Sequence, residues 1–241
     1  MRDFPIIVTR AEPGAEETYQ RLKTRDLNAI KSPVLQLIPD ASVQIPEPET
    51  LSGLIFTSAN GVRTYTARVV TNALPVWCVG PATAAAARDA GIEKVFESAG
   101  NALDLAAFIT ERSEPSGKPL LHVANNAAKG DLKRALAANG YSVDFCPLYA
   151  MKPATILTQE ARTALLDEKA CVVLIHSAKG ADAFAHLARE TSGRNLIAVA
   201  ISEPASRPLH ALRPRDIFIA ESPNEDGLFA ALETALATLS A

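Results

Sequence analysis

Short turns of small and hydroxyl-bearing residues follow the apolar runs of this 241-residue sequence. These turns are Thr9-Arg10, Thr57-Ser58-Ala59-Asn60, Gly80-Pro81-Ala82-Thr83, Ala124-Asn125-Asn126, His176-Ser177-Ala178-Lys179 and Ser202-Glu203-Pro204. Each of them leads directly into a segment with helical signals. Small side chains let a ligand approach the backbone, and the free N–H groups at a helix N-terminus favour carboxylates or phosphates. The chemistry that these turns indicate is therefore the binding of an anion.

Motifs for several other chemistries are missing. The sequence has no GxGxxG, no GxxxxGK followed by Ser or Thr, no HExxH and no GxSxG, which argues against a dinucleotide, a P-loop, a zincin site and a nucleophile elbow. The four histidines, which are His122, His176, His186 and His210, show no metal-ligand spacing. We therefore expect a protein that uses no metal and no organic cofactor.

Composition and charge narrow the function classes further. Hydrophobic residues make up 48% of the chain and charged residues 21%, as in ordinary globular proteins. A net charge of -3 gives no global attraction to nucleic acid or to an anionic membrane. Cys78, Cys146 and Cys171 lie far apart in apolar runs, so we expect buried free thiols in a reducing compartment. The charged start, with Arg2 and Asp3, does not resemble a signal peptide, and we expect a cytoplasmic protein.

Strand-like and helical segments alternate along the whole chain. The predicted strands are Pro5–Thr9, Ala29–Leu37, Leu54–Thr57, Val76–Val79, Lys94–Glu97, Leu120–Ala124, Ser142–Tyr149, Cys171–His176, Leu196–Ile201 and Asp216–Ala220. Several of them are continuous apolar runs, which is typical of parallel strands covered on both faces. Helix signals include Pro13 as a first helical residue, a start at Pro81, a cap at Asn101 and helix stops at Gly91 and Gly140. The pattern predicts an α/β protein with parallel sheets, whose ligands bind at the carboxyl ends of the strands.

The order of these signals occurs twice. FTSANGV at 56–62 is echoed by IHSAKGA at 175–181, and the opening IIVTR is echoed by LLHVA. With the pairs 77–87 and 199–209, and 103–109 and 227–233, the offsets lie between 114 and 123 residues. The sequence therefore predicts two similar α/β units. One cut between them would fall in the turn-rich loop at 113–119. Alternatively, the extended, proline-punctuated segments 29–39 and 142–153 form a linker ribbon, and periodicity alone does not choose between the two.

The motifs resemble those of the uroporphyrinogen-III synthase family over essentially the whole chain. They are VTR at 8–10, FTSANGV, VGPATA at 79–84, the Gly-Asp-Leu to Asn-Gly segment at 130–140, Pro-Leu-Tyr at 147–149, IHSAKGA and AISEPA. Two departures stand out. Ala205 replaces a threonine of some members, and Ala124-Asn125 stands where an Arg-Gly or similar pair is common.

The resemblance implies two flavodoxin-like parallel-sheet domains joined by a two-stranded β ribbon. One domain would comprise residues 1–34 and 154–241, the other residues 36–150, with the ribbon near 34–38 and 149–153. It also implies a monomeric, cofactor-independent lyase that closes hydroxymethylbilane to uroporphyrinogen III, with ring D inverted and water lost. Two units facing each other would then form an anion-binding cleft.

Site residues follow from the same resemblance. Tyr149 matches the family tyrosine proposed to assist departure of the substrate hydroxyl. A phenol can donate to that hydroxyl because it is protonated at pH 7. The structural alternative is a half-buried aromatic residue of a strand, with its hydroxyl at the rim. The expected substrate contacts are Arg10, Thr57, Ser58, Thr83, Ser177, Lys179 and Ser202. For Ser58, Thr83 and Ser177 the alternative is helix capping. For Arg10 and Lys179 it is a solvated surface charge.

A second function remains open at this point. A two-domain module that binds a small anion without converting it would need the same fold and the same strand-end turns. The isomer formed from hydroxymethylbilane distinguishes the two functions, because only a synthase directs closure to isomer III.

Overall fold

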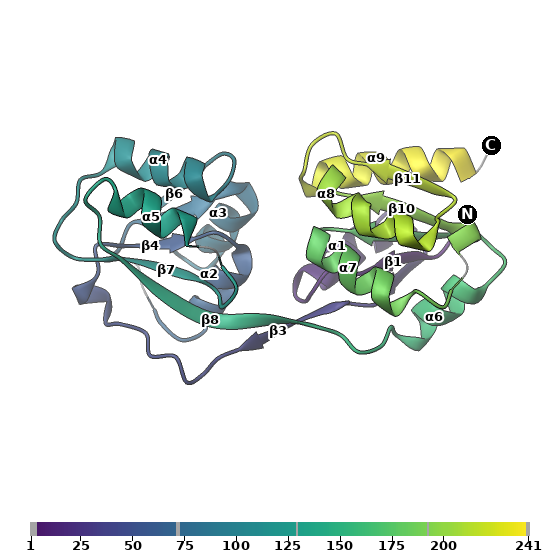
Figure 1. Ribbon diagram of the computed structural model, residues 1–241, viewed down its shortest axis with the longest axis horizontal. Coiled ribbons are helices and arrows are strands. Elements are labelled where there is room, and N and C mark those ends of the chain that lie inside the picture. Colours follow the sequence, from purple (N-terminus) through teal and green to yellow (C-terminus); the bar gives the residue numbers. More distant parts are fainter. Residues whose placement is uncertain (1–3, 71–72, 129, 192, 240–241) are drawn as a thin grey trace. The chain divides into compact units, whose positions relative to one another are not determined.

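The computed structural model describes residues 4–70, 73–128, 130–191 and 193–239. The chain divides into two compact units: unit 1 comprises Met1–Leu37 and Lys152–Ala241, and unit 2 comprises Ile38–Met151. Each unit contains one β-sheet with helices packed on it (Figure 1). The α/β class predicted from the alternating signals is confirmed.

Unit 1 is built on a five-stranded sheet in the order β11-β10-β9-β1-β2. Its strands are β1 (Ile6–Val8), β2 (Ala29–Lys31), β9 (Cys171–Ile175), β10 (Leu196–Ala200) and β11 (Asp216–Ile219). Each neighbouring pair is parallel. Numbered within the unit, the strand order is 2-1-3-4-5, as in flavodoxin-like sheets.

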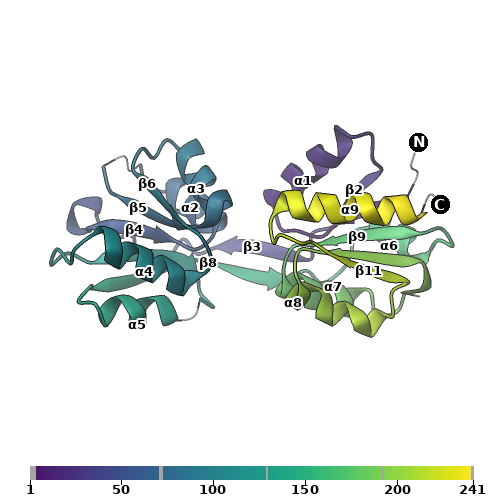
Figure 2. The ribbon, with the colours of Figure 1, turned by 90° about the horizontal axis from the view of Figure 1, so that it is seen from above.

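Helices cover both faces of this sheet, because its strands are apolar on both sides. On one face α1 (Gly14–Lys23) and α9 (Glu225–Leu239) lie side by side and share a core with Ile6, Leu174 and Val199 (Figure 2). The other face carries α6 (Gln159–Leu166), α7 (Ala178–Leu187), α8 (Glu203–Ser206) and the 3-10 turn η3 (Arg207–Leu212). A further 3-10 turn, η2 (Gly193–Asn195), precedes β10.

Unit 2 is built on a six-stranded sheet in the order β3-β8-β7-β4-β5-β6. Its strands are β3 (Leu35–Pro39), β4 (Gly53–Phe56), β5 (Val76–Val79), β6 (Val95–Ser98), β7 (Leu120–Asn125) and β8 (Val143–Pro153). The pairs from β8 to β6 are parallel. Without β3 the order is 3-2-1-4-5, which is the unit 1 arrangement with the chain entering at a different strand.

The helices of unit 2 also form two layers. On one face α4 (Ala102–Arg112) and α5 (Asp131–Ala137) share a core with Ile55 and Trp77. On the other face α2 (Ala59–Thr66) packs against α3 (Gly80–Asp89) (Figure 2). Gly61 lets α2 approach β7 closely, because a Cβ there would lie 2.9 Å from the carbonyl oxygen of Val123. The short turn η1 (Pro48–Thr50) precedes β4.

The sequence repeat is visible in the neighbours of each strand. β1 lies between β2 and β9, and its counterpart β7 lies between β8 and β4. Likewise β9-β10-β11 corresponds to β4-β5-β6. The first repeat therefore supplies β1 and β2 to unit 1 and β4, β5 and β6 to unit 2, and the second repeat does the reverse. The loop at 113–119 lies inside unit 2, so a cut there would divide that unit.

The chain passes between the units through β3 and β8, whose ranges contain both unit boundaries. The backbone N–H of Asp40 donates to the carbonyl of Leu148 at 2.8 Å, and that of Ala154 to Val34 at 2.9 Å. From one bond to the other, the residue numbers rise in the first segment and fall in the second. The two segments therefore form an antiparallel ribbon. The prediction of a single strand over Ala29–Leu37 was wrong. β2 and β3 are separate because the proline between them has no N–H for a ladder.

Most helix ends lie where the residue types predicted them. Asn101 caps α4 by accepting a hydrogen bond from the Leu103 N–H at 2.8 Å. Gly91 and Gly140 have φ of +83° and +84°, the left-handed conformation that follows many helices. Two starts were misplaced by one residue: Pro13 is the residue before α1 rather than its first member, and α3 begins at Gly80 rather than at the next residue.

Candidate functional site

Three strand ends of unit 2 bring Ser58, Asn125 and Tyr149 together. Ser58 follows β4, Asn125 is the last residue of β7, and Tyr149 lies in β8, and these strands are neighbours in the order β8-β7-β4. The side chains of Ser58 and Asn125 are the polar groups near the Tyr149 hydroxyl that act on its pKa. Ser58 and Tyr149 are predicted site residues, whereas Asn125 was noted only as a departure from the family pattern.

A β-bulge places Tyr149 opposite Asn125. The β7–β8 register shifts between Ala124 and Asn125: Ala124 faces Pro147, whereas Asn125 faces Tyr149. Leu148 is thus an extra residue in β8. A bulge of this kind changes the direction in which the following side chains point, and bulges are common beside active sites.

The Asn125 amide is held in one orientation. Its Oδ1 accepts a hydrogen bond from the Ala127 backbone N–H at 2.8 Å. The NH₂ group is therefore the part of the amide left to donate to the Tyr149 hydroxyl. Because the phenol oxygen accepts from Asn125, its own proton is directed elsewhere, toward Ser58 or a ligand.

Tyr149 is a buried phenol rather than a half-exposed one. Its side chain is 2% exposed, which disagrees with the alternative of a hydroxyl at the rim. Burial raises the pKa of Tyr149, and the hydrogen bonds with Ser58 and Asn125 oppose this effect without cancelling it. The group is consequently fully protonated at neutral pH and can act as a hydrogen-bond donor.

The predicted serines divide into two kinds. Ser58 accepts from the Asn60 N–H at 3.2 Å and Ser177 from the Gly180 N–H at 3.0 Å, so each caps the helix that follows its strand. Ser202 stands at the same place before α8, and its side chain makes no capping hydrogen bond. The hydroxyl of Ser202 is therefore not committed to its helix.

This difference predicts unequal effects of alanine substitution. Ser177→Ala is expected to lower the free energy of unfolding by about 1 kcal/mol, the usual contribution of an N-cap hydroxyl. Ser202→Ala, the matched control without a cap bond, is expected to change it by less than about 0.3 kcal/mol. Urea titration of both variants checks this. A large loss of catalytic rate in Ser177→Ala with unchanged unfolding would contradict the capping role.

The two predicted threonines of unit 2 differ in burial. Thr57 is half-buried directly after β4. Thr83 is 5% exposed and lies inside α3, whose N-cap residue is Val79. The alternative that Thr83 caps this helix is therefore wrong, because the helix begins three residues earlier, at Gly80.

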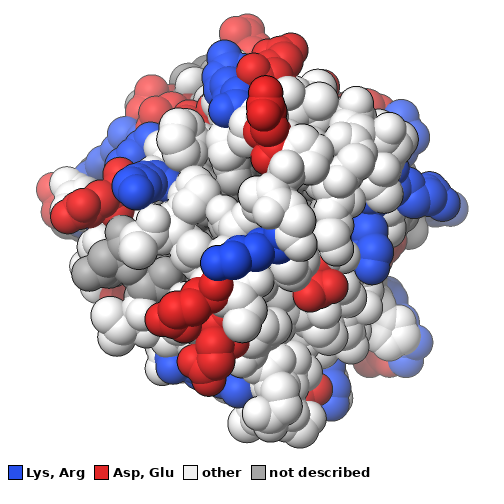
Figure 3. All heavy atoms as spheres, turned by 90° about the vertical axis from the view of Figure 1, so that its left-hand side faces the viewer, with Lys and Arg blue, Asp and Glu red and all other residues white. Residues whose placement is uncertain are grey.

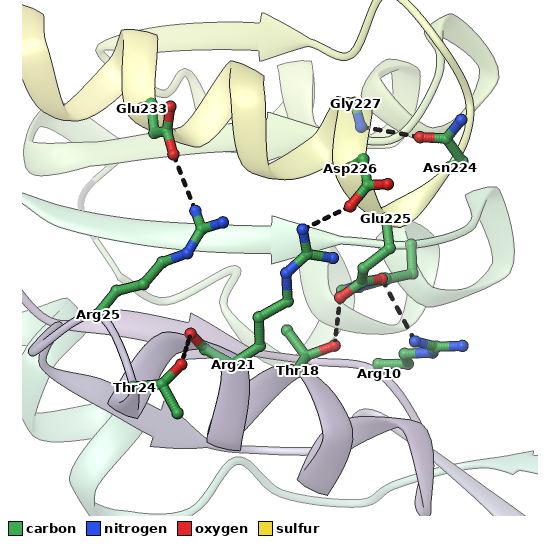
Figure 4. Close-up of polar contacts among 11 residues, drawn as sticks. Arg10, Thr18, Arg21, Thr24, Arg25, Asn224, Glu225, Asp226, Gly227 and Glu233 are labelled. Carbon is green, nitrogen blue, oxygen red and sulfur yellow. Dashed lines mark hydrogen bonds and ion pairs between the residues drawn. The ribbon is translucent and has the colours of Figure 1, made fainter.

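The carboxyl edge of the unit 1 sheet is organised around Glu225, the first residue of α9. Its Oε1 accepts a hydrogen bond from Thr18 Oγ1 at 2.7 Å, and its Oε2 lies 3.3 Å from Arg10 Nη1. The Nε2 atom of His176 lies 3.2 Å from the same Oε2. Four elements converge here: the ends of β1 and β9, and the helices α1 and α9. Figure 4 shows the side chains of Arg10, Thr18 and Glu225 directed toward one another.

The environment of Glu225 favours its ionised form. Burial by itself would raise the pKa of this carboxyl, but the neighbouring His176 ring, the Thr18 hydroxyl and the charge of Arg10 outweigh burial. Together they lower the pKa of Glu225 to about 2. Glu225 is thus a carboxylate throughout the physiological range. No sequence signal singled it out, because it belongs to a surface helix of ordinary composition.

The predicted unit 1 residues have different surroundings. Arg10 is ion-paired and its side chain is 31% exposed, so the alternative of a solvated surface charge does not describe it. Ser177 and Lys179 are exposed at the start of α7. His176, which belongs to one of the strand-end turns, has a side chain 9% exposed beside Glu225. Among the described residues, neither of its ring nitrogens has a hydrogen-bond partner in good geometry.

Other expectations concern groups away from these edges. The three cysteines are free and buried, as predicted, and burial raises the pKa of Cys78 and Cys171 to about 12. Within the described residues, no His, Cys, Asp and Glu side chains cluster as a metal site would require. None of the described helices is long and apolar enough to span a membrane. On the face in Figure 3, acidic and basic side chains are interspersed.

Comparison with known proteins identifies the family. The uroporphyrinogen-III synthase HemD family model matches residues 16–230. The uroporphyrinogen-III synthetase structure from Helicobacter pylori is similar with a TM-score of 0.66 and 18% identity, over 98% of this chain and 99% of that one. A mutant uroporphyrinogen III synthase from the extremely thermophilic bacterium Thermus thermophilus gives a TM-score of 0.53 and 16% identity, with the same coverage. The family match spans most of the sequence, and the chain belongs to the uroporphyrinogen-III synthase family.

Proposed function

We propose that this protein cyclises hydroxymethylbilane to uroporphyrinogen III, with inversion of ring D and loss of water, in haem biosynthesis. The family match over residues 16–230 is the observation that carries the proposal. The arrangement at the carboxyl edge of the unit 2 sheet supports it, because a buried, protonated phenol stands there beside a helix N-terminus.

The reaction demands conformational control more than reactive side chains. When the terminal hydroxyl takes up a proton and its carbon–oxygen bond breaks, water leaves and an azafulvene cation remains; the proton lost at the end of ring closure balances the one taken up. Attack by the substituted carbon of ring D forms a spiro intermediate, whose rearrangement and loss of a proton give the inverted ring. Uncatalysed closure gives the other isomer, so the protein must hold a folded conformer. Positioning of this kind can lower a barrier by roughly 7–11 kcal/mol.

Tyr149 is the group we assign to the departing hydroxyl. Its hydroxyl accepts from the oriented Asn125 amide, so its proton is available to hydrogen-bond the leaving oxygen. The phenol need not be deprotonated for this role, which agrees with the direction in which burial shifts its pKa. A donor placed at a developing leaving group stabilises the transition state more than the ground state.

The substrate carries eight carboxylates, and we assign its binding to the carboxyl edges of both sheets. In unit 2 the contacts are Thr57, Ser58 and Thr83. In unit 1 they are Arg10, Ser177, Lys179 and Ser202. Helix N-termini such as those of α2 and α7 attract carboxylates through backbone N–H groups and the helix dipole, so a net charge of -3 is no obstacle.

The remaining assignments belong to the same proposal. The enzyme is a cofactor-independent hydro-lyase, acts as a cytoplasmic monomer, and has no nucleic-acid or membrane partner. The dehydration needs only a proton donor and a shaped site, and the net charge gives no attraction to polyanionic surfaces.

One assay tests the function. The purified chain is supplied with hydroxymethylbilane, and the products are oxidised to porphyrins and separated by chromatography. We expect uroporphyrinogen III to predominate, against isomer I in the enzyme-free control. Formation of isomer I alone would refute the synthase function and favour a binding module without catalysis.

A further inference from the structure

Arg10 is held in place on one side of its guanidinium. Among the described residues its ion pairs are made through Nη1, which lies 3.3 Å from Glu225 Oε2 and 4.0 Å from Glu17 Oε2. These pairs orient the guanidinium from the Nη1 side, and Nη2 is the nitrogen that we assign to a ligand. A carboxylate of the substrate is the kind of ligand that an oriented guanidinium binds well.

The backbone of α1 provides the surface on which Arg10 rests. Gly14 lies beneath the guanidinium: a Cβ added there would be 2.4 Å from Nε and 2.7 Å from Cζ of Arg10. A side chain at this position would displace the arginine. The absence of one lets a long and flexible side chain lie flat across the start of the helix.

Glu225 is itself held by α1. The Thr18 hydroxyl donates to Oε1 at 2.7 Å, and Oε2 faces both Arg10 Nη1 at 3.3 Å and His176 Nε2 at 3.2 Å. Arg21 of α1 and Arg25, which follows the end of α1, contact the helix that carries Glu225: they lie 4.1 and 4.7 Å from the centre of the Phe229 ring. Arg21 also pairs with Asp226 and Arg25 with Glu233, as Figure 4 shows.

We propose that Glu225 is a positioning residue that fixes Arg10 at the carboxyl edge of the unit 1 sheet for binding a substrate carboxylate. The inference rests on the proposed function, in which Arg10 contacts the substrate. In this role Glu225 acts on the substrate through Arg10 and does not touch the reacting atoms, so its removal affects substrate affinity and leaves the chemical step unchanged. Without it the arginine samples many rotamers, and ordering it again on binding reduces affinity.

A double-mutant cycle with hydroxymethylbilane as the probe tests this coupling. We expect Arg10→Met to raise KM about tenfold and Glu225→Gln to raise it about fivefold, each with kcat within about twofold of wild type. The double variant is expected to resemble Arg10→Met within about twofold, because Glu225 has nothing left to position. Independent effects would instead multiply to about fiftyfold and would overturn the proposal, as would an unchanged KM in Glu225→Gln.

The chain offers a matched control in Glu233→Gln. This change removes a carboxylate from the same helix and breaks the ion pair in which Glu233 Oε1 lies 2.8 Å from Arg25 Nη1. It does not touch Arg10, so we expect an unchanged KM. A rise in KM equal to that of Glu225→Gln would show that any loss of α1–α9 pairing has this effect, and the positioning role would be wrong.

A second variant keeps the test valid if Glu225→Gln does not fold. Thr18→Val preserves the shape of the side chain and removes the hydrogen bond that orients Glu225. We expect this change to raise KM two- to threefold in the wild-type background. In the Arg10→Met background we expect it to leave KM unchanged. An equal rise in both backgrounds would overturn the proposal. Failure of the proposed function can be distinguished from failure of the positioning role. If the proposed function is wrong, the wild-type enzyme forms isomer I from hydroxymethylbilane, whatever the double-mutant cycle shows.

Discussion

Tyr149→Phe is expected to lower kcat by roughly 10- to 100-fold, equivalent to about 1.4–2.7 kcal/mol of transition-state stabilisation. The change removes the one proton donor of the cluster around Ser58 and Asn125 that we assign to the departing hydroxyl. KM is expected to change less than about threefold, because Tyr149 is not among the residues to which we assign the substrate carboxylates. Steady-state kinetics with hydroxymethylbilane, together with the ratio of isomers, measures both quantities.

Tyr65→Phe is the control for removing a buried phenol hydroxyl. Tyr65 is fully buried in α2, burial raises its pKa to about 12, and its hydroxyl has no hydrogen-bond partner within the described part of the chain. Removal of the Tyr65 hydroxyl is expected to leave kcat unchanged and to leave the free energy of unfolding unchanged or slightly higher. A loss in Tyr149→Phe below about threefold, or about 0.7 kcal/mol, would exclude the acid role.

The fold was largely predictable because its signals are local. Continuous apolar runs such as Cys171–Ile175 and Leu196–Ala200 identify strands that are buried on both faces. Capping residues and left-handed glycines mark the helix ends. What local patterns do not contain is the partner of each strand. β2 and β3 are consecutive in sequence yet belong to different sheets: β2 pairs with β1 near the start of the chain, whereas β3 pairs with β8, more than 100 positions later.

Only those residues of the candidate site that have a local sequence signature could be predicted. Ser58 and Ser177 were identifiable because strand-end serines before helices have a local signature. Asn125 was not, since its contact with Tyr149 depends on a bulge between two strands. Glu225 and its contact with His176 were missed because the two residues meet only when the start of α9 lies at the end of β9. Residues whose role depends on such packing have no spacing that a single sequence displays.

Glu225→Gln is expected to destabilise the protein by about 2–3 kcal/mol at pH 6 and by much less at pH 3. The carboxyl has a pKa of 4.5 when unperturbed and about 2 in the folded chain, so the unfolded chain binds the proton more readily. Acid therefore favours unfolding. The stabilisation is fully present above about pH 5, and about 2 kcal/mol of it is lost by pH 3. The side chain is 27% exposed, so solvent screens the effect only partly.

The measurement is urea unfolding of wild type and variant at pH 6 and pH 3, with hydrogen exchange of the β9 and β10 amides reporting unit 1 directly. Other carboxyls titrate in both proteins, so only the difference between them is informative. Glu233→Gln breaks an exposed pair and is expected to differ from wild type by less than about 0.5 kcal/mol at either pH. A Glu225→Gln difference that stays constant between pH 6 and pH 3 would mean that packing, and not charge, is what Glu225 contributes. In that case Arg10 would not depend on the carboxylate for its position.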